Sequence, residues 1–548
     1  MKKINLFMAA GIAGSLLLFQ SCSKKIDEAY LNPNAQTVQP IEELLPNVIQ
    51  NMVISNTAQG TLYGPQNDGL YVGRYIQNWG TNTANNQYDQ MGGATGGSDI
   101  LGSIWAMHYY GMGQNVTRII EWGTEQKKWD YVGVAHAIRA WSWLQLTDMY
   151  GEAILKDAFN TSILVFRYDT QQEIYEEAKR QAHLAIDFLS RSGDGVSADN
   201  LAKGAQWTSY KGDKEKWKRF AYSVLARVFN RYTNKGSLYK ADSVIHYANQ
   251  GITSNADNLY VLFEGGATVK MSYYGPTRGN IGTLRQTKFI ADLMSGVNTR
   301  FNTAAVDPRA WYKLRENTNG TFKGITLPSG TAGLLAADIP PNFWGSTGTT
   351  GTPANSRYIW QDAMPWPIIT ASEMAFLKAE ANYRKNLKGD ARTAYREGIL
   401  LDFDMLTSVA QYGNGVPAAN RIDATVRDNY LANAIVVPAA NALTLSHIML
   451  QKYIALYGYG FIETWADMRR FHYLDTEGTT GEQVYADFAP PTLANLYQDN
   501  KQKYVYRARP RYNSEYLYNI DGLNQIGAMV GNAQVLDYHT KEMWYSMY

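Results

Sequence analysis

Two long stretches of the sequence combine aromatic rings with side-chain amides and arginines, and this mixture of groups could bind a carbohydrate. Residues 55–103 are rich in Gly, Asn, Gln and Thr and also contain Arg74, Trp79 and Tyr88, while residues 252–368 are rich in Gly, Thr, Asn, Trp and Tyr. A Trp or Tyr ring can stack on the apolar C–H face of a pyranose, while amides and guanidinium groups hydrogen-bond its hydroxyls. The candidate ligand-binding residues are therefore Arg74, Trp79, Asn82, Tyr88, Tyr273, Tyr274, Arg278, Trp344 and Trp360.

Each of these rings could instead pack in the protein core, which is the more common place for a tryptophan. Trp79 and Tyr88 are flanked by Gly and Asn, which leave little apolar structure against which a ring could pack. We therefore predict that Trp79 and at least one aromatic residue from 270–362 line a shared exposed site. Tryptophans within helical patterns are expected in the core, and these are Trp141, Trp143, Trp217 and Trp465.

The sequence carries no motif of an enzyme active site or of a bound cofactor. The seven histidines lie far apart, and a P-loop, a nucleophile elbow and a convincing dinucleotide fingerprint are all missing. No calcium-loop spacing is present either, so we predict neither a metal nor a cofactor. A glycosidase could take its two carboxylates from any of the 49 acidic residues, which keeps a surface glycoside hydrolase open as a less favoured alternative. The net charge of +2 argues against nucleic acid as a partner.

The N-terminus has the pattern of an export signal that ends at a lipidated cysteine. Lys2 and Lys3 precede a mostly apolar run over residues 4–19, which has the length of a signal-peptide core and is short for a membrane span. Cys22, the single cysteine, follows a small residue, as in bacterial lipoproteins; the alternative is a plain secretory signal with an unrelated thiol. We expect a signal peptide over residues 1–21, lipidation of Cys22 and a flexible tether over residues 22–40.

Helical patterns dominate residues 41–548, which we expect to form a single domain. An apolar stripe marks residues 129–150, and Gly151 is placed to end that helix. Thr170 with Glu173, and Thr370 with Glu373, are expected to form capping boxes at two helix starts. The helix spacing suggests pairs of the tetratricopeptide kind. The predicted fold is thus mostly α, interrupted by long loop-rich excursions at about 55–103 and 252–368.

Five stretches of the sequence, in order along the chain, form a recognisable set of motifs: "AHAIRAWSWLQLTDMYGEAIL", "KWKRFAYSVLARVFNRYT", "ITASEMAFLKAEANYRKN", "LQKYIALYGYGFIETWADMRRFHY" and "RARPRYNSEYLYN". In this order they resemble the SusD/RagB family of surface lipoproteins of Bacteroidota, and the likeness covers nearly the whole chain after the signal. The departures are few: Tyr222 stands where the family usually has Asn, Asn513 replaces a proline, and the usual proline is missing from Ala153-Ile154-Leu155.

This resemblance implies both a fold and a function. The fold would be SusD-like, with tetratricopeptide-like helix pairs and loop excursions that form the ligand face. The function would be non-catalytic capture of a glycan, or of a peptide or another nutrient, at the outer membrane and on the cell surface. The ligand would then be delivered to a SusC-type TonB-dependent transporter. The aromatic and amide content favours a glycan over a peptide, and no binding residue is carried over from the family.

Overall fold

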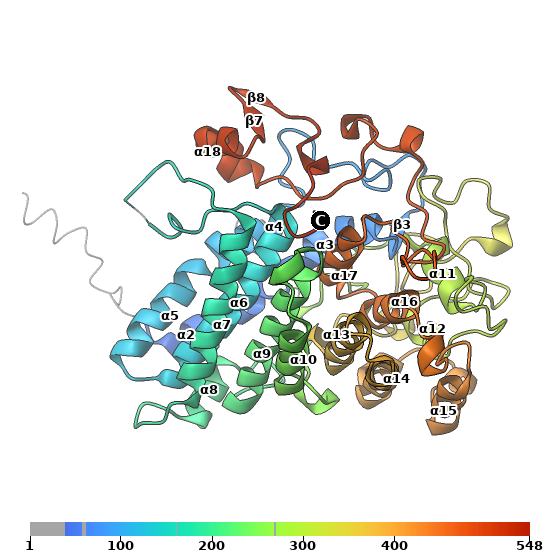
Figure 1. Ribbon diagram of the computed structural model, residues 1–548, viewed down its shortest axis with the longest axis horizontal. Coiled ribbons are helices and arrows are strands. Elements are labelled where there is room, and N and C mark those ends of the chain that lie inside the picture. Colours follow the sequence, from blue (N-terminus) through green and yellow to red (C-terminus); the bar gives the residue numbers. More distant parts are fainter. Residues whose placement is uncertain (1–38, 57–61, 161, 268–269) are drawn as a thin grey trace, which may run out of the picture.

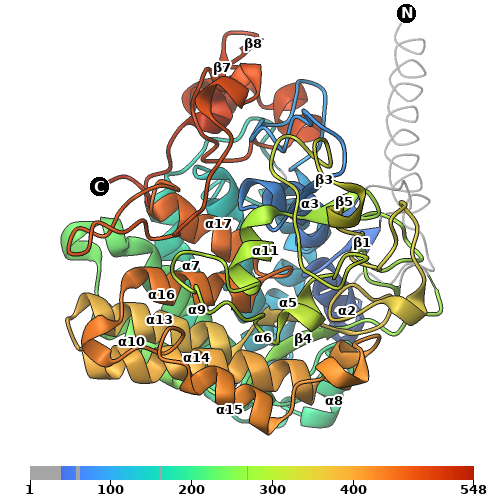
Figure 2. The same cartoon turned by 90° about the vertical axis from the view of Figure 1, so that its right-hand side faces the viewer.

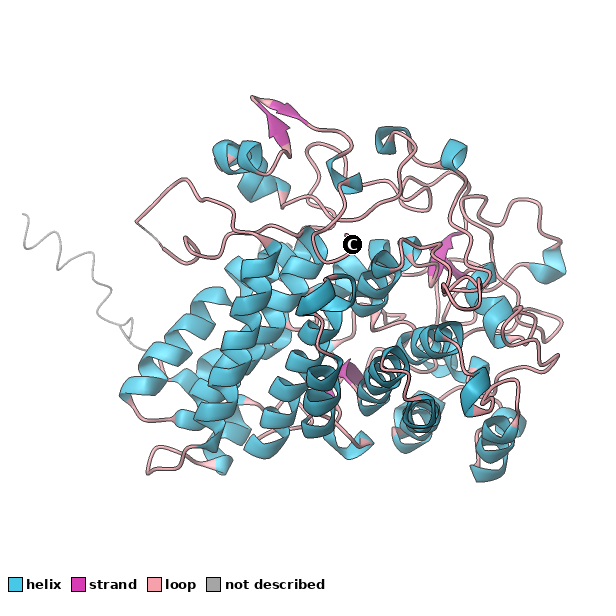
Figure 3. Ribbon diagram, viewed as in Figure 1, coloured by secondary structure: helices cyan, strands magenta, loops and turns pink. Residues whose placement is uncertain are grey.

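Helices gather on one side of the molecule and irregular loops on the other (Figure 1 and Figure 3). The structure, a computed structural model, describes residues 39–56, 62–160, 162–267 and 270–548. The expected signal peptide, Cys22 and all of the expected tether except residues 39 and 40 lie outside the described residues. Within the described part, no helix has the length and apolar character needed to cross a membrane.

Long helices that follow one another in the sequence pack side by side, which confirms a mostly α fold built from helix pairs. Each of the pairs α5–α6, α6–α7, α9–α10 and α13–α14 is in direct contact. The helices of this layer are α2 (Ile41–Asn51), α5 (Gly113–Glu125), α6 (Trp129–Tyr150), α7 (Gln171–Ser190), α9 (Lys214–Arg231), α10 (Ala241–Gln250), α13 (Ala371–Arg384), α14 (Lys388–Ser408), α16 (Leu445–Leu456) and α17 (Phe461–Arg470).

Shorter elements complete the molecule, and the C-terminal ones lie above the helical layer in Figure 2. In the described part of the chain, the strands form antiparallel pairs: β1 (Ser55–Asn56) with β2 (Leu62–Tyr63), β3 (Trp79–Thr81) with β5 (Leu284–Gln286), β4 (Leu259–Leu262) with β6 (Pro365–Ile369), and β7 (Met529–Val530) with β8 (Ala533–Gln534). The short helices are α3 (Pro65–Tyr75), α4 (Ser103–Ala106), α8 (Ala198–Gly204), α11 (Lys288–Met294), α12 (Ala310–Lys313), α15 (Ala424–Ala432) and α18 (Ile520–Gln525).

The expected helix ends are confirmed with one exception. Helix α6 ends at Gly151, whose φ of 80° is a conformation that favours glycine. Thr170 and Glu173 form a reciprocal capping box at the start of α7. At α13 the Thr370 hydroxyl accepts from the Glu373 N–H, but the Glu373 carboxylate does not return the bond because it pairs with Arg227 instead. The second capping box is therefore only half formed.

Buried ion pairs join the long helices across the core. Arg231 of α9 lies 2.8 Å from Asp148 of α6 and also pairs with Glu463 of α17. Arg227, one turn earlier on α9, lies 3.1 Å from Glu463 and 2.6 Å from Glu373 of α13. Although burial opposes it, the positive charge of the two arginines lowers the pKa of Glu463 to about 2. Losing one partner would leave a buried charge unpaired, so these pairs fix how the helices pack.

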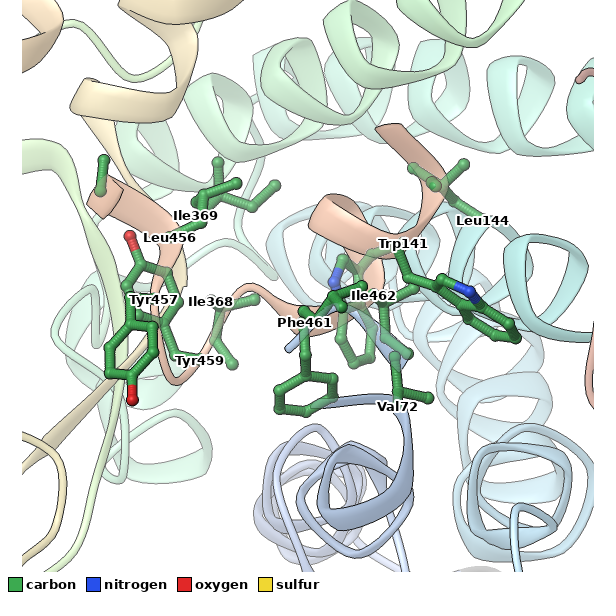
Figure 4. Packing of buried hydrophobic residues seen from close by; sticks show 14 of the residues in the cluster. Val72, Trp141, Leu144, Ile368, Ile369, Leu456, Tyr457, Tyr459, Phe461 and Ile462 are labelled. Atoms are coloured by element: carbon green, nitrogen blue, oxygen red, sulfur yellow. The ribbon is translucent and has the colours of Figure 1, made fainter. Parts of the chain in front are cut away.

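An apolar core surrounds these charges. Figure 4 shows part of it, where Trp141 of α6, Ile462 of α17 and Val72 of α3 gather. The tryptophans expected in the core are all buried there, and they are Trp141, Trp143, Trp217 and Trp465.

The excursion at 55–103 is more regular than its composition suggested. It contains α3 and β3, and β3 pairs with β5 from the second excursion, so that Trp79 lies opposite Gln286. The sequence patterns predicted a loop-rich excursion here and did not indicate α3 or β3. Gly69 and Gly73 lower the helix propensity of this segment and hide its helical pattern.

Candidate ligand-binding site

Helix α3 has two faces that carry different kinds of residue. A Cβ atom added to Gly69 would lie 2.5 Å from the Phe461 ring, and one added to Gly73 would lie 2.2 Å from the Trp79 indole. The glycine face is thus pressed against aromatic side chains of the interior. Asn67, Tyr71 and Arg74 have the i, i+4, i+7 spacing of the opposite face.

Aromatic rings from both excursions meet behind the glycine face. We call Trp79, Tyr274, Phe343 and Trp360 the inner cluster. The Trp79 ring centroid lies 5.8 Å from that of Tyr274 and 5.8 Å from that of Trp360, both at steep angles. Phe343 stacks on Trp360 with 4.2 Å between centroids. These spacings are those of well-packed aromatic pairs.

The polar atoms of the indoles in this region are satisfied inside the protein. Trp79 Nε1 donates to the Leu70 carbonyl at 3.1 Å, and Trp360 Nε1 donates to the Lys313 carbonyl at 3.2 Å. The adjacent Trp344 donates to the Tyr274 carbonyl at 3.0 Å. No indole N–H of these three tryptophans is left to bind a ligand.

The prediction of an exposed site that contains Trp79 is therefore wrong. Trp79 and Tyr274 are 0% exposed, and Trp344 and Trp360 are 1% exposed. The two excursions do come together, but these four rings form core. Gly73 of α3 allows the helix to approach Trp79 closely. The apolar partners of Trp79 come from residues about 200 to 280 positions away in the sequence.

Four other candidate residues, Arg74, Tyr88, Tyr273 and Arg278, gather on the outward face of α3. We call Asn67, Tyr71, Arg74, Asn86, Tyr88, Tyr273 and Arg278 the outer cluster. Tyr71 and Tyr88 meet edge to face with 4.6 Å between centroids. The Arg74 guanidinium lies 5.5 Å from the Tyr71 centroid and 5.8 Å from that of Tyr88, which is cation–π range. Its Nη1 also donates to Asn86 Oδ1 at 2.8 Å, and this hydrogen bond joins α3 to the loop that contains Asn86.

A buried carboxylate anchors Arg74 from behind. Asp89 lies 3.7 Å from Arg74 Nε and is 0% exposed. Burial raises the pKa of Asp89, while the charge of Arg74 and hydrogen bonds from Thr81 act in the opposite direction. Arg74 is itself 9% exposed, so its main role is to position the two tyrosine rings.

Tyr273 and Arg278 extend the outer cluster from the second excursion. The Tyr273 hydroxyl donates to Asn67 Oδ1 at 2.9 Å, and Asn67 donates in turn to Ser103 Oγ at 2.7 Å. The Arg278 guanidinium lies 5.2 Å from the Tyr273 ring centroid. Burial raises the pKa of Tyr273 to about 12, and the nearby Tyr71 hydroxyl adds to this rise. The two tyrosines thus belong to one surface.

The residues of the outer cluster differ in how far solvent reaches them. Tyr88 and Tyr273 are 8% and 6% exposed, whereas Tyr71, Asn67, Asn86 and Arg278 are half-buried. The accessible surface therefore combines the Tyr71 ring with amides and the Arg278 guanidinium. Such a surface can stack on an apolar ring face and hydrogen-bond the groups around it.

Sequence reasoning missed several members of this surface and misplaced another. The sequence analysis does not include Tyr71 and Asn67 among the candidates, because it does not predict α3. Asn67, Tyr71 and Arg74 have the i, i+4, i+7 spacing of one helix face, and this spacing is the signal that would have found them. Tyr497 approaches Tyr88 from the C-terminal region, which no local pattern indicates. Asn82 lies after β3, where its backbone bonds to Thr283 and Thr331, and these contacts do not link it to the outer cluster.

The histidines of the described chain show no arrangement for metal binding. No group of three or more His, Cys, Asp or Glu side chains in the described residues could hold a metal ion. Burial lowers the pKa of His136 to about 4 and that of His447 to about 3, so both are neutral near pH 7.

Comparison with known proteins identifies relatives along most of the chain. The model of a SusD-like family, described as starch-binding and associating with the outer membrane, matches residues 33–487. No curated protein sequence matches the chain.

Solved structures share the fold at low sequence identity. A SusD/RagB family protein from Bacteroides thetaiotaomicron is 21% identical, with a TM-score of 0.67 over 93% of this chain and 99% of the other. A chitin-binding SusD homologue from Flavobacterium johnsoniae is 18% identical, with a TM-score of 0.60 over 92% of this chain and 98% of the other. Another structure, described as a chitin-binding protein, is 17% identical, with a TM-score of 0.65 over 93% of this chain and 100% of the other.

These findings agree with the helical layer, the loop face and the sequence motifs. The family is one of outer-membrane, nutrient-binding proteins that are not enzymes. The chain belongs to the SusD/RagB family, in its SusD-like branch.

Proposed function

We propose that the outer cluster captures an oligosaccharide or polysaccharide at the cell surface and that the protein delivers this ligand to a SusC-type TonB-dependent transporter. The observation that carries the proposal is the half-buried Tyr71 ring, held against Tyr88 by Arg74 and bordered by the amide of Asn67. A ring fixed in this way loses little entropy when a sugar stacks on it. The polar groups beside it suit the hydroxyls at the sugar edge.

The family description and the neighbouring structures support a glycan over other nutrients. The family is described as starch-binding, and two structural neighbours are described as chitin-binding. Both polymers present pyranose rings with one apolar face. The outer cluster has the complementary groups, and the inner cluster, being fully buried, does not offer its rings to a ligand.

Native affinity electrophoresis tests this proposal. The protein is run through gels that contain starch, a soluble chitin derivative, or other plant, microbial and host polysaccharides. We expect one polymer to retard the wild type and Tyr71→Ala to reduce this retardation. Tyr518→Ala is the matched control, because Tyr518 is 75% exposed and lies in the C-terminal region outside the outer cluster. Retention of the Tyr71→Ala variant equal to that of the wild type would contradict the site, and no retardation by any polymer would favour a peptide or another nutrient.

Anchoring and partnership require separate tests. We propose that Cys22 carries the lipid that holds the protein to the outer membrane. Replacing Cys22 with Ala should move the protein from the membrane fraction to the soluble fraction, and full retention in the membrane would contradict lipid anchoring.

The transporter should co-purify with the wild-type protein in mild detergent, and its absence would contradict the delivery step.

A further inference from the structure

A pocket that shares no lining residue with the outer cluster lies between two π-helical turns. One turn spans Met107–Gly111 directly after α4, and the other spans Tyr512–Tyr516 before α18. Single π-helical turns are rare and are frequently found at functional sites. The pocket between them has a volume of about 330 Å³, and the segment before α7 closes its third side. Its principal lining residues are Trp105, Tyr109, Tyr110, Phe159, Phe166 and Glu515.

Aromatic rings form the walls of this pocket. Trp105 and Tyr109 are 4.9 Å apart between centroids, and Tyr109 and Phe159 are 6.1 Å apart. The Tyr109 hydroxyl donates to the Ile154 carbonyl at 2.7 Å and accepts from the Ile154 N–H at 2.9 Å, so this ring is held in place. Tyr110, which is 52% exposed, stands at the rim. Several rings around one space are the arrangement with which proteins bind organic cations.

A buried carboxylate contributes to the lining of the same pocket. Glu515 is 4% exposed, and its Oε2 accepts from the Tyr168 hydroxyl at 2.8 Å and from Asn519 Nδ2 at 2.9 Å. Within the described residues no basic side chain forms an ion pair with Glu515, although buried carboxylates are usually paired. Burial raises its pKa, which records the energetic cost of holding this charge without a counter-ion.

Two arginines lie close to rings of the pocket, but each of them binds another group. Arg511 lies 5.7 Å from the Tyr110 ring centroid but pairs with Asp99 at 2.7 Å. Arg139 lies 4.8 Å from the Phe159 centroid and donates to the Gly113 carbonyl at 2.8 Å. Neither arginine neutralises Glu515.

Trp105 supports the charged form of this carboxylate. Its side chain is 0% exposed and lies close to Glu515, and its indole N–H lowers the pKa of the carboxyl against the effect of burial.

We propose that this pocket binds a small organic ammonium ion, whose apolar body lies among the rings and whose positive charge is neutralised by Glu515. The rings attract the cation through their negative faces, and the carboxylate supplies the counter-charge that the protein itself lacks here. The pocket shares no lining residue with the outer cluster, so each site can be altered without touching the other.

Isothermal titration of the full-length protein in detergent tests the proposal with two matched probes. Phenethylammonium carries the charge, and 2-phenylethanol is its neutral counterpart of nearly the same shape. We expect saturable binding of phenethylammonium at least tenfold tighter than that of 2-phenylethanol. Glu515→Gln should remove most of this difference by weakening the ammonium ion at least tenfold, while the affinity for the alcohol stays within a few fold.

A second variant keeps the test decisive if Glu515→Gln fails to fold. Ala158, a half-buried lining residue, can be changed to Trp to fill the pocket while Glu515 is left in place. This variant should bind neither probe yet keep its retardation in polysaccharide gels, which shows that the outer cluster is intact. Equal affinity for the two probes in the wild type, no binding of either probe at millimolar concentration, or unchanged binding in both variants would overturn the proposal.

Discussion

The inner and outer clusters lie on opposite faces of one short helix, yet they have different surroundings and different tasks. Both take aromatic residues from the same two excursions of the chain. In the inner cluster, glycines of α3 give the rings room, and every indole N–H bonds to a backbone carbonyl. In the outer cluster, guanidinium groups lie over the rings, and the hydroxyl of Tyr273 bonds to a side-chain amide. Aromatic content alone therefore does not distinguish a binding surface from a core.

What distinguishes the two clusters is the residue type on each face of α3. Glycine at positions 69 and 73 is required by close contact with Phe461 and Trp79. Tyrosine and arginine at positions 71 and 74 are not needed to fill the core, because their neighbours are polar or partly exposed. The comparison predicts that inner variants change stability and that outer variants change ligand affinity.

Trp79→Ala should give the largest effect. Removing a fully buried indole costs about 3–5 kcal/mol in the free energy of unfolding, because it leaves a cavity and removes the hydrogen bond to the Leu70 carbonyl. Urea unfolding followed by circular dichroism measures the loss. Tyr71→Ala is the matched outer variant and should cost less than about 1 kcal/mol. Equal destabilisation by the two variants would break the distinction between the clusters.

Gly73→Ala should give the next largest effect, although alanine normally favours a helix. The added Cβ would meet the Trp79 indole at 2.2 Å, so either α3 or the ring must move, at a cost of about 1–3 kcal/mol. Gly389→Ala in α14 is the control, since a Cβ at that position meets nothing within 4 Å. The control should be neutral or stabilising by up to about 1 kcal/mol. A stabilising Gly73→Ala would show that α3 does not rest on Trp79.

The sequence motifs predicted the helical layer well because they contain the residues that hold it together. Asp148, Arg227, Glu373 and Glu463 all lie in the stretches that resemble the SusD/RagB family, and the structure joins them in one buried network. A second set in the same stretches pairs Arg470 with Glu380 at 2.8 Å and with Asp467 at 2.6 Å. Charges that must pair across helices constrain the sequence strongly, so this part of the fold could be predicted from it.

The site was harder to predict because its geometry depends on contacts between distant segments. Arg74, Tyr88, Tyr273 and Arg278 were predicted as site residues and do lie together, whereas Trp79 lies in the core. Composition could not separate these cases, since both sets have Gly and Asn as neighbours. Burial of Trp79 depends on Tyr274 and Trp360, which only the folded chain brings near it. Whether the outer cluster binds a ligand stays a prediction.

The buried carboxyl of Asp68, on α3, should make the stability of the protein depend on pH. Burial raises the pKa of Asp68 to about 7, although N–H groups of Ser103 and Ile104 donate to its carboxylate at 3.2 and 2.8 Å. The unfolded chain loses this proton near pH 4, whereas the folded protein keeps it until about pH 7. The contribution of Asp68 to stability is therefore complete below about pH 4 and is lost as the pH rises to about 7.

Asp68→Asn tests this pH dependence because the amide keeps an acceptor oxygen and cannot ionise. Unfolding free energies of the wild type and the variant are compared from pH 4.5 to pH 7.5, so that other titrating groups cancel. We expect the variant to lack the fall in stability that Asp68 causes over this range. Parallel curves for the two proteins would show that Asp68 does not titrate in this window.

The smallest effect, on affinity rather than on stability, is expected from Tyr71. Tyr71→Ala should weaken binding of the glycan about tenfold, or roughly 1.4 kcal/mol, because one stacking ring is lost while Tyr88 and Arg74 remain. Tyr71→Phe keeps the ring and should stay within about threefold of the wild type, which assigns the effect to stacking rather than to the hydroxyl. Titration with an oligosaccharide of the retarding polymer measures both variants. If Tyr71→Phe binds as weakly as Tyr71→Ala, the hydroxyl and not the ring face recognises the ligand, and the outer cluster acts through hydrogen bonds.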